Sequence, residues 1–281
     1  MNPIVDTHQH LWDLTQLHLP WLDGGGPLAK SHTPEDYQRE SEGLNVVKTV
    51  YMEVDVEPAQ KVAEATYVLG LCADPGNPMT GAVIGGNPAE EGFVSYIAQF
   101  AGNPYLKGVR QVLHGGMPVG TCLQPLFRRH MEYLASVGLR FDLCLRSTEL
   151  LDGAQLAALC PSTRFILDHC GNADPKATDR SQWEDDITEV AKQPNVLCKI
   201  SGIVAGARPG AWTPDDLAPI ILHCAEVFGP DRIMFASDWP VCTLTATYRQ
   251  WVEALQSIVA DWSETDRRKL FHDNAVRFYE L

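Results

Sequence analysis

Short apolar runs recur along the chain, and stretches with helical spacing of apolar and polar residues separate them. The starts of these runs lie roughly 25 to 40 residues apart, a spacing typical of repeated strand–helix units. Most runs are apolar on both faces, as expected for parallel strands that are covered by helices. The pattern predicts eight strands, over residues 4–7, 46–54, 81–85, 106–113, 139–145, 164–168, 196–200 and 233–236.

Helices are predicted in the intervals between these strands. Thr33 and Thr213 are each followed by proline, so both are placed to cap a helix that begins with proline. Ser263 and Asp266 resemble a capping box at the start of the final helix. The predicted helices cover residues 34–43, 59–72, 123–137, 150–159, 183–192, 214–228, 247–259 and 263–279.

The alternation of strands and helices predicts a single (β/α)8 barrel domain over residues 1–281. An open doubly wound sheet is the alternative fold. The first predicted strand, however, is not followed by the Gly-x-Gly-x-x-Gly motif of dinucleotide-binding sheets. A barrel would carry its active site at the carboxyl ends of the strands.

Composition narrows the classes of partner. The net charge of −14 argues against binding to nucleic acid or anionic membranes, which requires a cationic surface. The N-terminus lacks a basic segment followed by an apolar one, and no apolar run approaches the roughly 18 residues of a membrane span. The eight cysteines form no Cys-x-x-Cys pair and are typical of buried thiols in a reducing compartment. We expect a cytoplasmic protein with a small-molecule substrate, and the sequence is compatible with a homo-oligomer.

Residues able to titrate or to donate hydrogen bonds follow almost every predicted strand. The first strand runs into the segment 6–10, Asp-Thr-His-Gln-His, in which alternate side chains point to one side and aim His8 and His10 at one point. Such a pair suits a divalent metal or proton transfer. The residues after the other strands are Glu53 and Asp55, Asn87, Arg110 and His114, Asp142 and Arg146, Asp168 and His169, Lys199 and Ser201, and Asp238. Their convergence at one end of a barrel predicts an enzyme.

Six segments spread over the chain carry a resemblance to a known family. They are Val-Asp-Thr-His-Gln-His-Leu-Trp-Asp (5–13), Leu-Lys-Gly-Val-Arg-Gln (106–111), Leu-Asp-His-Cys-Gly (167–171), Cys-Lys-Ile-Ser-Gly (198–202), Phe-Ala-Ser-Asp-Trp-Pro (235–240) and Asn-Ala-Val-Arg-Phe-Tyr (274–279). With them the chain resembles the amidohydrolase superfamily, in the amidohydrolase-2 branch that includes sugar-acid lactonases of the L-fuconolactonase and L-rhamnonolactonase type.

The resemblance implies a set of metal ligands. His8 and His10 would follow the first strand, His169 the fifth and Asp238 the eighth, and in metal-dependent relatives these positions bind one divalent ion, usually zinc. Lys199 stands where many of those relatives have another histidine, after the sixth strand. The bridging lysine expected after the fourth strand is absent from residues 142–146, so a two-metal centre is not expected. Because some similar lactonases work without metal, one zinc ion and no metal both remain open.

The same residues have expected catalytic roles. Asp238 is the expected general base, because one carboxylate can take a proton from water and return it to the leaving oxygen. His169 is expected to bind metal or to hydrogen-bond the carbonyl oxygen as that oxygen gains charge. His8 and His10 would act in the same two ways, and Asp6 is expected to orient one of them.

Six further residues are expected to bind substrate: Arg110, Trp12, Lys199, Trp239, Glu53 and Arg146. Arg110 could hold a hydroxyl or a carboxylate in bidentate fashion, with a salt bridge as the alternative. For Lys199, a buried ion pair with an acid such as Asp142 is an equally good alternative. The two tryptophans could face a sugar ring or simply fill the core. Asp168 is expected to face away from the site, and His114 to be structural or solvated.

The favoured hypothesis is hydrolysis of the lactone ring of a sugar acid, an aldonolactone. The alternative is a zinc-dependent decarboxylase of an aromatic or unsaturated carboxylic acid, which Lys199 in place of a histidine disfavours. A non-catalytic barrel that only binds a ligand is the third hypothesis, and the many titratable residues at strand ends argue against it.

Overall fold

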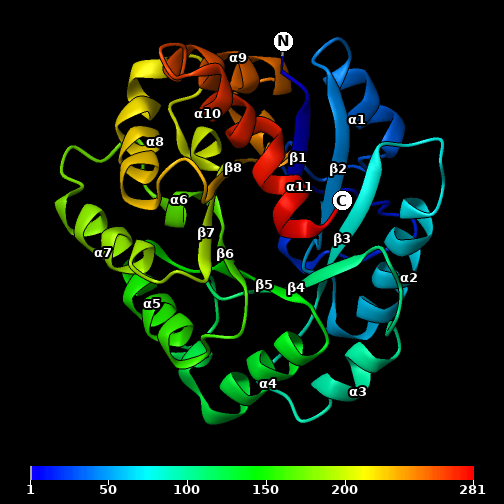
Figure 1. Cartoon of the computed structure of the whole chain (residues 1–281). Helices are drawn as coiled ribbons and strands as arrows, with labels where there is room; N and C mark the ends of the chain where they lie inside the picture. Colours follow the sequence, from blue (N-terminus) through cyan, green and yellow to red (C-terminus); the bar gives the residue numbers. More distant parts are fainter. Residues whose placement is uncertain (1) are drawn as a thin grey trace.

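The computed structural model describes residues 2–281, and its strands form one sheet of eight parallel strands in chain order. Figure 1 shows the strands around a common centre with helices outside them, so the predicted (β/α)8 barrel is confirmed. Every predicted strand is present, with each end within two residues of its prediction. The strands are β1 (Ile4–Gln9), β2 (Val46–Met52), β3 (Met79–Gly85), β4 (Leu106–Val112), β5 (Arg140–Cys144), β6 (Phe165–Leu167), β7 (Val196–Ile200) and β8 (Ile233–Phe235).

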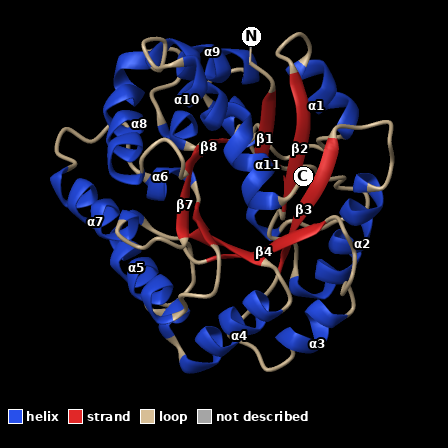
Figure 2. Ribbon diagram, viewed as in Figure 1, coloured by secondary structure: helices blue, strands red, loops and turns tan. Residues whose placement is uncertain are grey.

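Most of the helices lie between consecutive strands and cover the outside of the barrel, and the last three follow β8 (Figure 2). Thr33 and Thr213 cap their helices through capping boxes, as their sequences predict. Two helices were not predicted, the short α3 and a turn at residues 169–172, and a π-helical segment interrupts the predicted final helix at Lys269–Asp273. The helices are α1 (Pro34–Ser41), α2 (Lys61–Cys72), α3 (Phe93–Ala98), α4 (Pro125–Ser136), α5 (Leu150–Leu159), α6 (His169–Asn172), α7 (Ser181–Ala191), α8 (Pro214–Phe228), α9 (Tyr248–Ile258), α10 (Glu264–Arg268) and α11 (Asn274–Tyr279). None of the helices within residues 2–281 is long and apolar enough to cross a membrane.

The C-terminal helix α11 closes the amino end of the barrel. Apolar side chains inside the barrel form a layer with residues of α11, namely Val5, Val50, Met52, Val83, Ile166, Met234, Ala275, Phe278 and Tyr279. The Arg140 side chain at the start of β5 fixes the helix, because its Nε donates to the Phe278 carbonyl oxygen at 2.9 Å. Figure 1 shows α11 crossing this end of the barrel. Only the opposite, carboxyl end is left for a site.

The first and last strands meet through the segments that follow them. Gln9 and Trp239 form a parallel bridge. The Asp238 amide donates to the His8 carbonyl oxygen at 2.9 Å, and the His10 amide donates to the Trp239 carbonyl oxygen at 2.8 Å. Closure of the barrel therefore brings together the backbone of the histidine pair and of Asp238, although some 230 residues separate them.

Candidate active site

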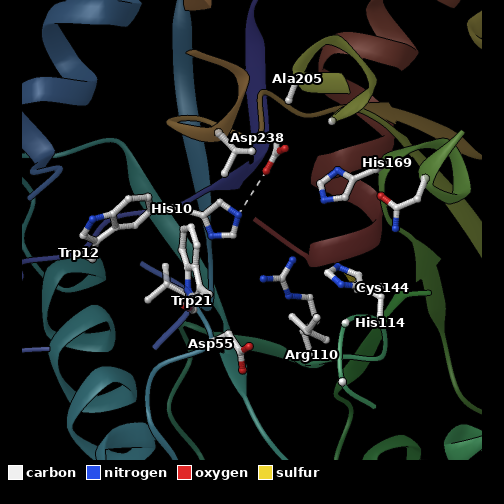
Figure 3. Close-up of a pocket in the computed structure, with 17 residues that line it drawn as sticks. His10, Trp12, Trp21, Asp55, Arg110, His114, Cys144, His169, Ala205 and Asp238 are labelled. Atoms are coloured by element: carbon white, nitrogen blue, oxygen red, sulfur yellow. Dashed lines mark hydrogen bonds and ion pairs between the residues drawn. The ribbon is translucent and has the colours of Figure 1, made fainter. Parts of the chain in front are cut away.

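A cavity of about 580 Å³ lies at the carboxyl ends of the strands (Figure 3). This volume is typical of small-molecule sites, which span about 300–1,000 Å³. Its titratable lining residues are His10, Asp55, Arg110, His114, Cys144, His169 and Asp238. Apolar and aromatic side chains form much of the remaining wall, chiefly Trp12, Trp21, Val54, Val112 and Val241.

Left-handed backbone is concentrated at this end of the barrel. Within the described chain, seven residues other than glycine have a positive φ, and five of them, Asp55, His169, Cys170, Asn172 and Asp238, follow β2, β6 or β8. Such a conformation costs about 1–2 kcal/mol per residue and persists where surrounding contacts impose it. Three of the five belong to α6, which is therefore a left-handed turn.

Side-chain contacts hold this turn in place. The Asn172 side-chain amide donates to the Leu145 carbonyl oxygen at 2.6 Å, and the indole of Trp183 donates to the Cys170 carbonyl oxygen at 3.0 Å. The His169 ring lies with its Nδ1 2.9 Å from the Ser201 hydroxyl oxygen. The turn thus directs the His169 ring toward the cavity across from Asp238 (Figure 3).

Three potential ligand atoms converge at the mouth of β1 and β8. The His8 Nε2 and His10 Nε2 atoms are 3.1 Å apart, and Asp238 Oδ1 lies 3.7 Å from the first and 3.3 Å from the second. Ligands about 2.0–2.1 Å from a tetrahedral zinc ion are about 3.3 Å from one another. The spacing of these three atoms therefore fits a single metal ion.

The protonation of the two imidazoles supports that fit. His10 Nδ1 is 3.0 Å from the Met52 carbonyl oxygen, which can only accept, so Nδ1 carries the proton and Nε2 a lone pair. Arg110 Nη1 can only donate a hydrogen bond and lies 3.2 Å from His8 Nε2, so this ring nitrogen also carries a lone pair. Burial lowers the pKa of His8 well below its usual value, so the ring is neutral. Two ring nitrogens and a carboxylate oxygen thus face one point, a donor set that suits a divalent cation, and an ion there would replace the hydrogen bond from Arg110 to His8.

His169 belongs to a different group of potential ligands. Its ring nitrogen lies with His8 and Asp168, with ligand atoms within 4.8 Å of one another, whereas the first group consists of His8, His10 and Asp238. The His8 and His169 ring centroids are 4.5 Å apart. The four residues predicted as one ligand set therefore lie at one site, but His169 stands apart from the other three.

A network of buried charges lies under the cavity floor. The Arg110 guanidinium is paired with Glu53, Nε to Oε1 at 2.6 Å, and with Asp168, Nη1 to Oδ2 at 3.5 Å. Lys199 forms ion pairs with Asp142 and, at 3.1 Å, with Asp168. Burial alone would raise the pKa of Asp168, but Lys199 and His8 hold it well below its usual value. Burial raises the pKa of Asp142 to about 7 although Lys199 opposes the rise. The two cations thus hold an acidic network beneath His8.

The predicted substrate-binding residues divide into two sets. Arg110 and Trp12 line the cavity. Glu53, Lys199 and Trp239 are buried and are not among its lining residues, and neither is Arg146. Arg146 donates to the carbonyl oxygens of Leu113, Gly115 and Met117 and pairs with Glu149, so it braces the loop after β4.

Two predicted orientations are wrong. Asp168 was expected to face away from the site, but its Oδ1 lies 3.4 Å from His8 Nδ1. Strand alternation fails there because β6 ends at Leu167 and the left-handed turn follows. Asp6 was expected to orient an imidazole, but its carboxylate accepts from the backbone amides of His8 and Ser237 and from two tyrosine hydroxyls, because the register of β1 shifts after Asp6.

The strand numbers that the resemblance implied are also corrected. His169 follows the sixth strand rather than the fifth, and Lys199 lies on the seventh. Cys144, at the end of β5, lines the cavity. The fourth strand carries Arg110 rather than lysine toward its carboxyl end, so the expectation against a two-metal centre is unchanged.

Several lining residues were not predicted as site residues. His114 follows a strand but was expected to be structural or solvated, and it lines the cavity; Asn172 follows the end of β6, so its position along the chain could have indicated it. Asp55 also follows a strand end, and burial raises its pKa. Trp21 comes from the long loop after β1 and is fixed by donation from its indole to the Val54 carbonyl oxygen at 2.8 Å. No local pattern identifies that contact, since it depends on how the loop folds over the barrel.

Comparison with known proteins shows the family to which this chain belongs. The amidohydrolase family model (Amidohydro_2) matches residues 5–281, and the chain therefore belongs to this amidohydrolase family and is a hydrolase. The uncharacterized protein y4mH of Sinorhizobium fredii is 31% identical, with 99% of this chain and 98% of that protein covered. An L-fucono-1,5-lactonase of Burkholderia multivorans is 27% identical, with 99% and 96% covered. A crystal structure of a zinc-bound amidohydrolase from Burkholderia multivorans superimposes with a TM-score of 0.88 at 24% identity, covering 99% of both chains.

Proposed function

We propose that this chain is a single-domain hydrolase that opens the lactone ring of a sugar acid, with Asp238 as the general base. The observation that carries the proposal is the position of the Asp238 carboxylate, which lines the cavity 3.3 Å from His10 Nε2. The similarity to an L-fucono-1,5-lactonase over nearly the whole chain supports the substrate class.

The chemistry needs a proton to move twice. Asp238 takes a proton from a water molecule while the water oxygen attacks the lactone carbonyl carbon. The carboxylic acid so formed then gives the proton to the ring oxygen as the carbon–oxygen bond breaks, which yields the open hydroxy acid and restores the carboxylate. The carboxylate is 6% exposed, so it reaches the cavity while most of its surface is screened from bulk water.

Two imidazoles are placed to stabilise the carbonyl oxygen as it gains charge. His169 lines the cavity, and Ser201 engages its Nδ1, which leaves Nε2 for the substrate. His114 also lines the cavity, and no hydrogen bond ties its ring to another described residue. Burial lowers the pKa of His114, so its ring is neutral near pH 7 and its N–H can donate. Preorganised donors of this kind commonly contribute a large part of the rate enhancement.

A metal ion would be held by His8, His10 and Asp238, whose donor atoms fit one divalent cation. When bound, it would polarise the carbonyl group and lower the pKa of a bound water toward about 7. The zinc in the Burkholderia multivorans amidohydrolase structure supports zinc as the ion to test.

The charge of the cavity favours a neutral substrate. Of the described residues that line it, Arg110 is the one lysine or arginine, and its charge is matched by Glu53 and Asp168. Binding a substrate carboxylate would require a cation that is not already paired. A neutral polyhydroxy lactone therefore fits this cavity better than the carboxylic acid of the alternative decarboxylase.

A substrate panel tests the proposal. Purified protein, with and without added zinc, is offered L- and D-aldonolactones, one lactone that carries a second carboxylate, and aromatic carboxylic acids. Proton release is followed with a pH indicator against enzyme-free blanks, and carbon dioxide is measured in parallel. We expect turnover of at least one neutral aldonolactone and weaker turnover of the carboxylated lactone. Carbon dioxide release without lactone turnover would overturn the proposal.

A further inference from the structure

Three buried cysteines meet at one point outside the cavity. They are Cys170 in α6, Cys198 in β7 and Cys224 in α8, and their sulfur atoms lie within 4.8 Å of one another. All three residues are fully buried. The chain has eight cysteines, and within the described residues the other five belong to no such group. Three distant segments of sequence thus supply one thiol each to this cysteine triad.

The surroundings of the triad are apolar. Its members belong to the hydrophobic core between the sheet and the helices. The Cys170 and Cys198 sulfur atoms donate weak hydrogen bonds to the Lys199 carbonyl oxygen, at 3.6 and 3.8 Å. A ligand there must bind sulfur strongly and must leave little net charge in the core.

We propose that the cysteine triad is a binding site for a trivalent thiophilic metalloid of the arsenite type. Three thiolates carry three negative charges, so a monovalent or divalent ion leaves a net negative charge buried, whereas trivalent arsenic gives a neutral complex. A bond of about 2.3 Å to sulfur, as in zinc thiolates, places three sulfur atoms at most about 4 Å apart, within reach of the spacing seen.

The binding reaction balances without a redox partner. Arsenite, As(OH)3, reacts with three thiols to give As(S-Cys)3 and three water molecules. Three arsenic–oxygen bonds and three sulfur–hydrogen bonds break, while three arsenic–sulfur bonds form and each hydroxyl leaves as water with a thiol proton. The oxidation states of arsenic and sulfur do not change.

The triad is connected to the cavity through the left-handed turn. Cys170 directly follows His169, and both have positive φ angles, 51° and 56°. A second cavity, of about 280 Å³, borders His169 and Asn172 of the same turn. Cys170 belongs to this turn, so local opening of the turn would give a small neutral molecule a route to the triad.

Arsenic X-ray absorption on the intact protein tests the site directly. The full chain, kept reduced with a phosphine, is incubated with sodium arsenite and freed of excess reagent. We expect one arsenic atom per chain with three sulfur neighbours and no oxygen neighbour, and native mass spectrometry should show the gain of one arsenic less three hydrogens. An absence of bound arsenic, or a shell that retains oxygen, would overturn the proposal without any variant being made.

Substitutions then test which cysteines supply the three sulfur ligands. Cys198→Ser and Cys224→Ser should each lose the three-sulfur complex, whereas Cys72→Ser, which changes a buried cysteine of α2 outside the triad, should retain it. Retention of three sulfur neighbours in both triad variants would contradict the assignment. Circular dichroism checks that each variant is folded before arsenite is added.

Discussion

Ionisation of Glu64 is predicted to limit the stability of the fold above neutral pH. This side chain is buried under the cavity wall, where its Oε1 accepts from the Tyr51 hydroxyl at 2.9 Å and from the Val54 amide at 2.8 Å. Its Oε2 has no hydrogen-bond partner. Burial, followed by the negative charge of Glu53, raises the pKa of Glu64 from 4.5 to about 7.

Because the pKa of Glu64 is raised in the folded state, the free energy of unfolding decreases as Glu64 ionises. A carboxyl group whose folded pKa is raised contributes its full stability below pH 4.5, and that contribution is lost as the pH rises through about 7. Between pH 5 and pH 8 the loss from Glu64 amounts to about 2–3 kcal/mol, which is most of the loss over the whole titration. In Glu64→Gln the side chain stays neutral and keeps an oxygen for Tyr51 and Val54, so this loss should disappear.

Thermal unfolding of both proteins at pH 5 and pH 8 measures the difference. At roughly 2 °C per kcal/mol for a chain of this size, the Tm of Glu64→Gln relative to wild type should rise by about 5 °C between the two pH values. Using the difference between two proteins removes the titration of the groups that do not interact with Glu64. Glu91→Gln, at an exposed glutamate, should show no such change. Parallel pH profiles for wild type and Glu64→Gln would refute the reasoning.

Three further predictions concern the cavity and the charges below it. Lys199→Met leaves the buried carboxylates of Asp142 and Asp168 without their common cation. The free energy of unfolding, measured in urea, should therefore fall by about 3–5 kcal/mol. A change near zero would mean that Lys199 does not neutralise these carboxylates. Gly202→Ala should lower both kcat and Tm, because a Cβ at this position would collide with the His169 ring. Gly210→Ala is the control, since Gly210 has a similar positive φ but open space around it, and it should lower Tm alone. Equal kcat values in the two variants would contradict this prediction. Zinc should raise the Tm of metal-free wild type but not of His10→Ala, and an equal rise in both would place the ion elsewhere.

The barrel could be predicted because its signal is distributed along the whole chain. Eight apolar runs with regular spacing identify the strands whatever the loops do, and parallel strands place all their carboxyl ends at one edge. That edge contains Arg110, His169 and Asp238, each predicted from its place just after or near the end of a strand. For Lys199 the sequence left two roles open, substrate binding and an ion pair with an acid such as Asp142, and the structure contains the ion pair.

What could not be predicted depends on departures from regular strands. The left-handed turn after β6 reverses the direction expected for Asp168, and strand alternation carries no information about it. Trp21 reaches the cavity from a loop whose path is set by tertiary contacts rather than by periodicity. Glu53 and Trp239 follow the right strands, but packing buries them behind the cavity wall.

The kcat of Asp238→Asn for lactone hydrolysis tests the central claim most directly. Asn accepts the left-handed backbone at this position, so the substitution removes the base while keeping the fold. Asp55→Asn is the matched control, since Asp55 is another carboxylate of the cavity with a positive φ. We predict that kcat falls by about 10²–10⁴-fold in Asp238→Asn and by less than about tenfold in Asp55→Asn. An unchanged kcat in folded Asp238→Asn would contradict the account.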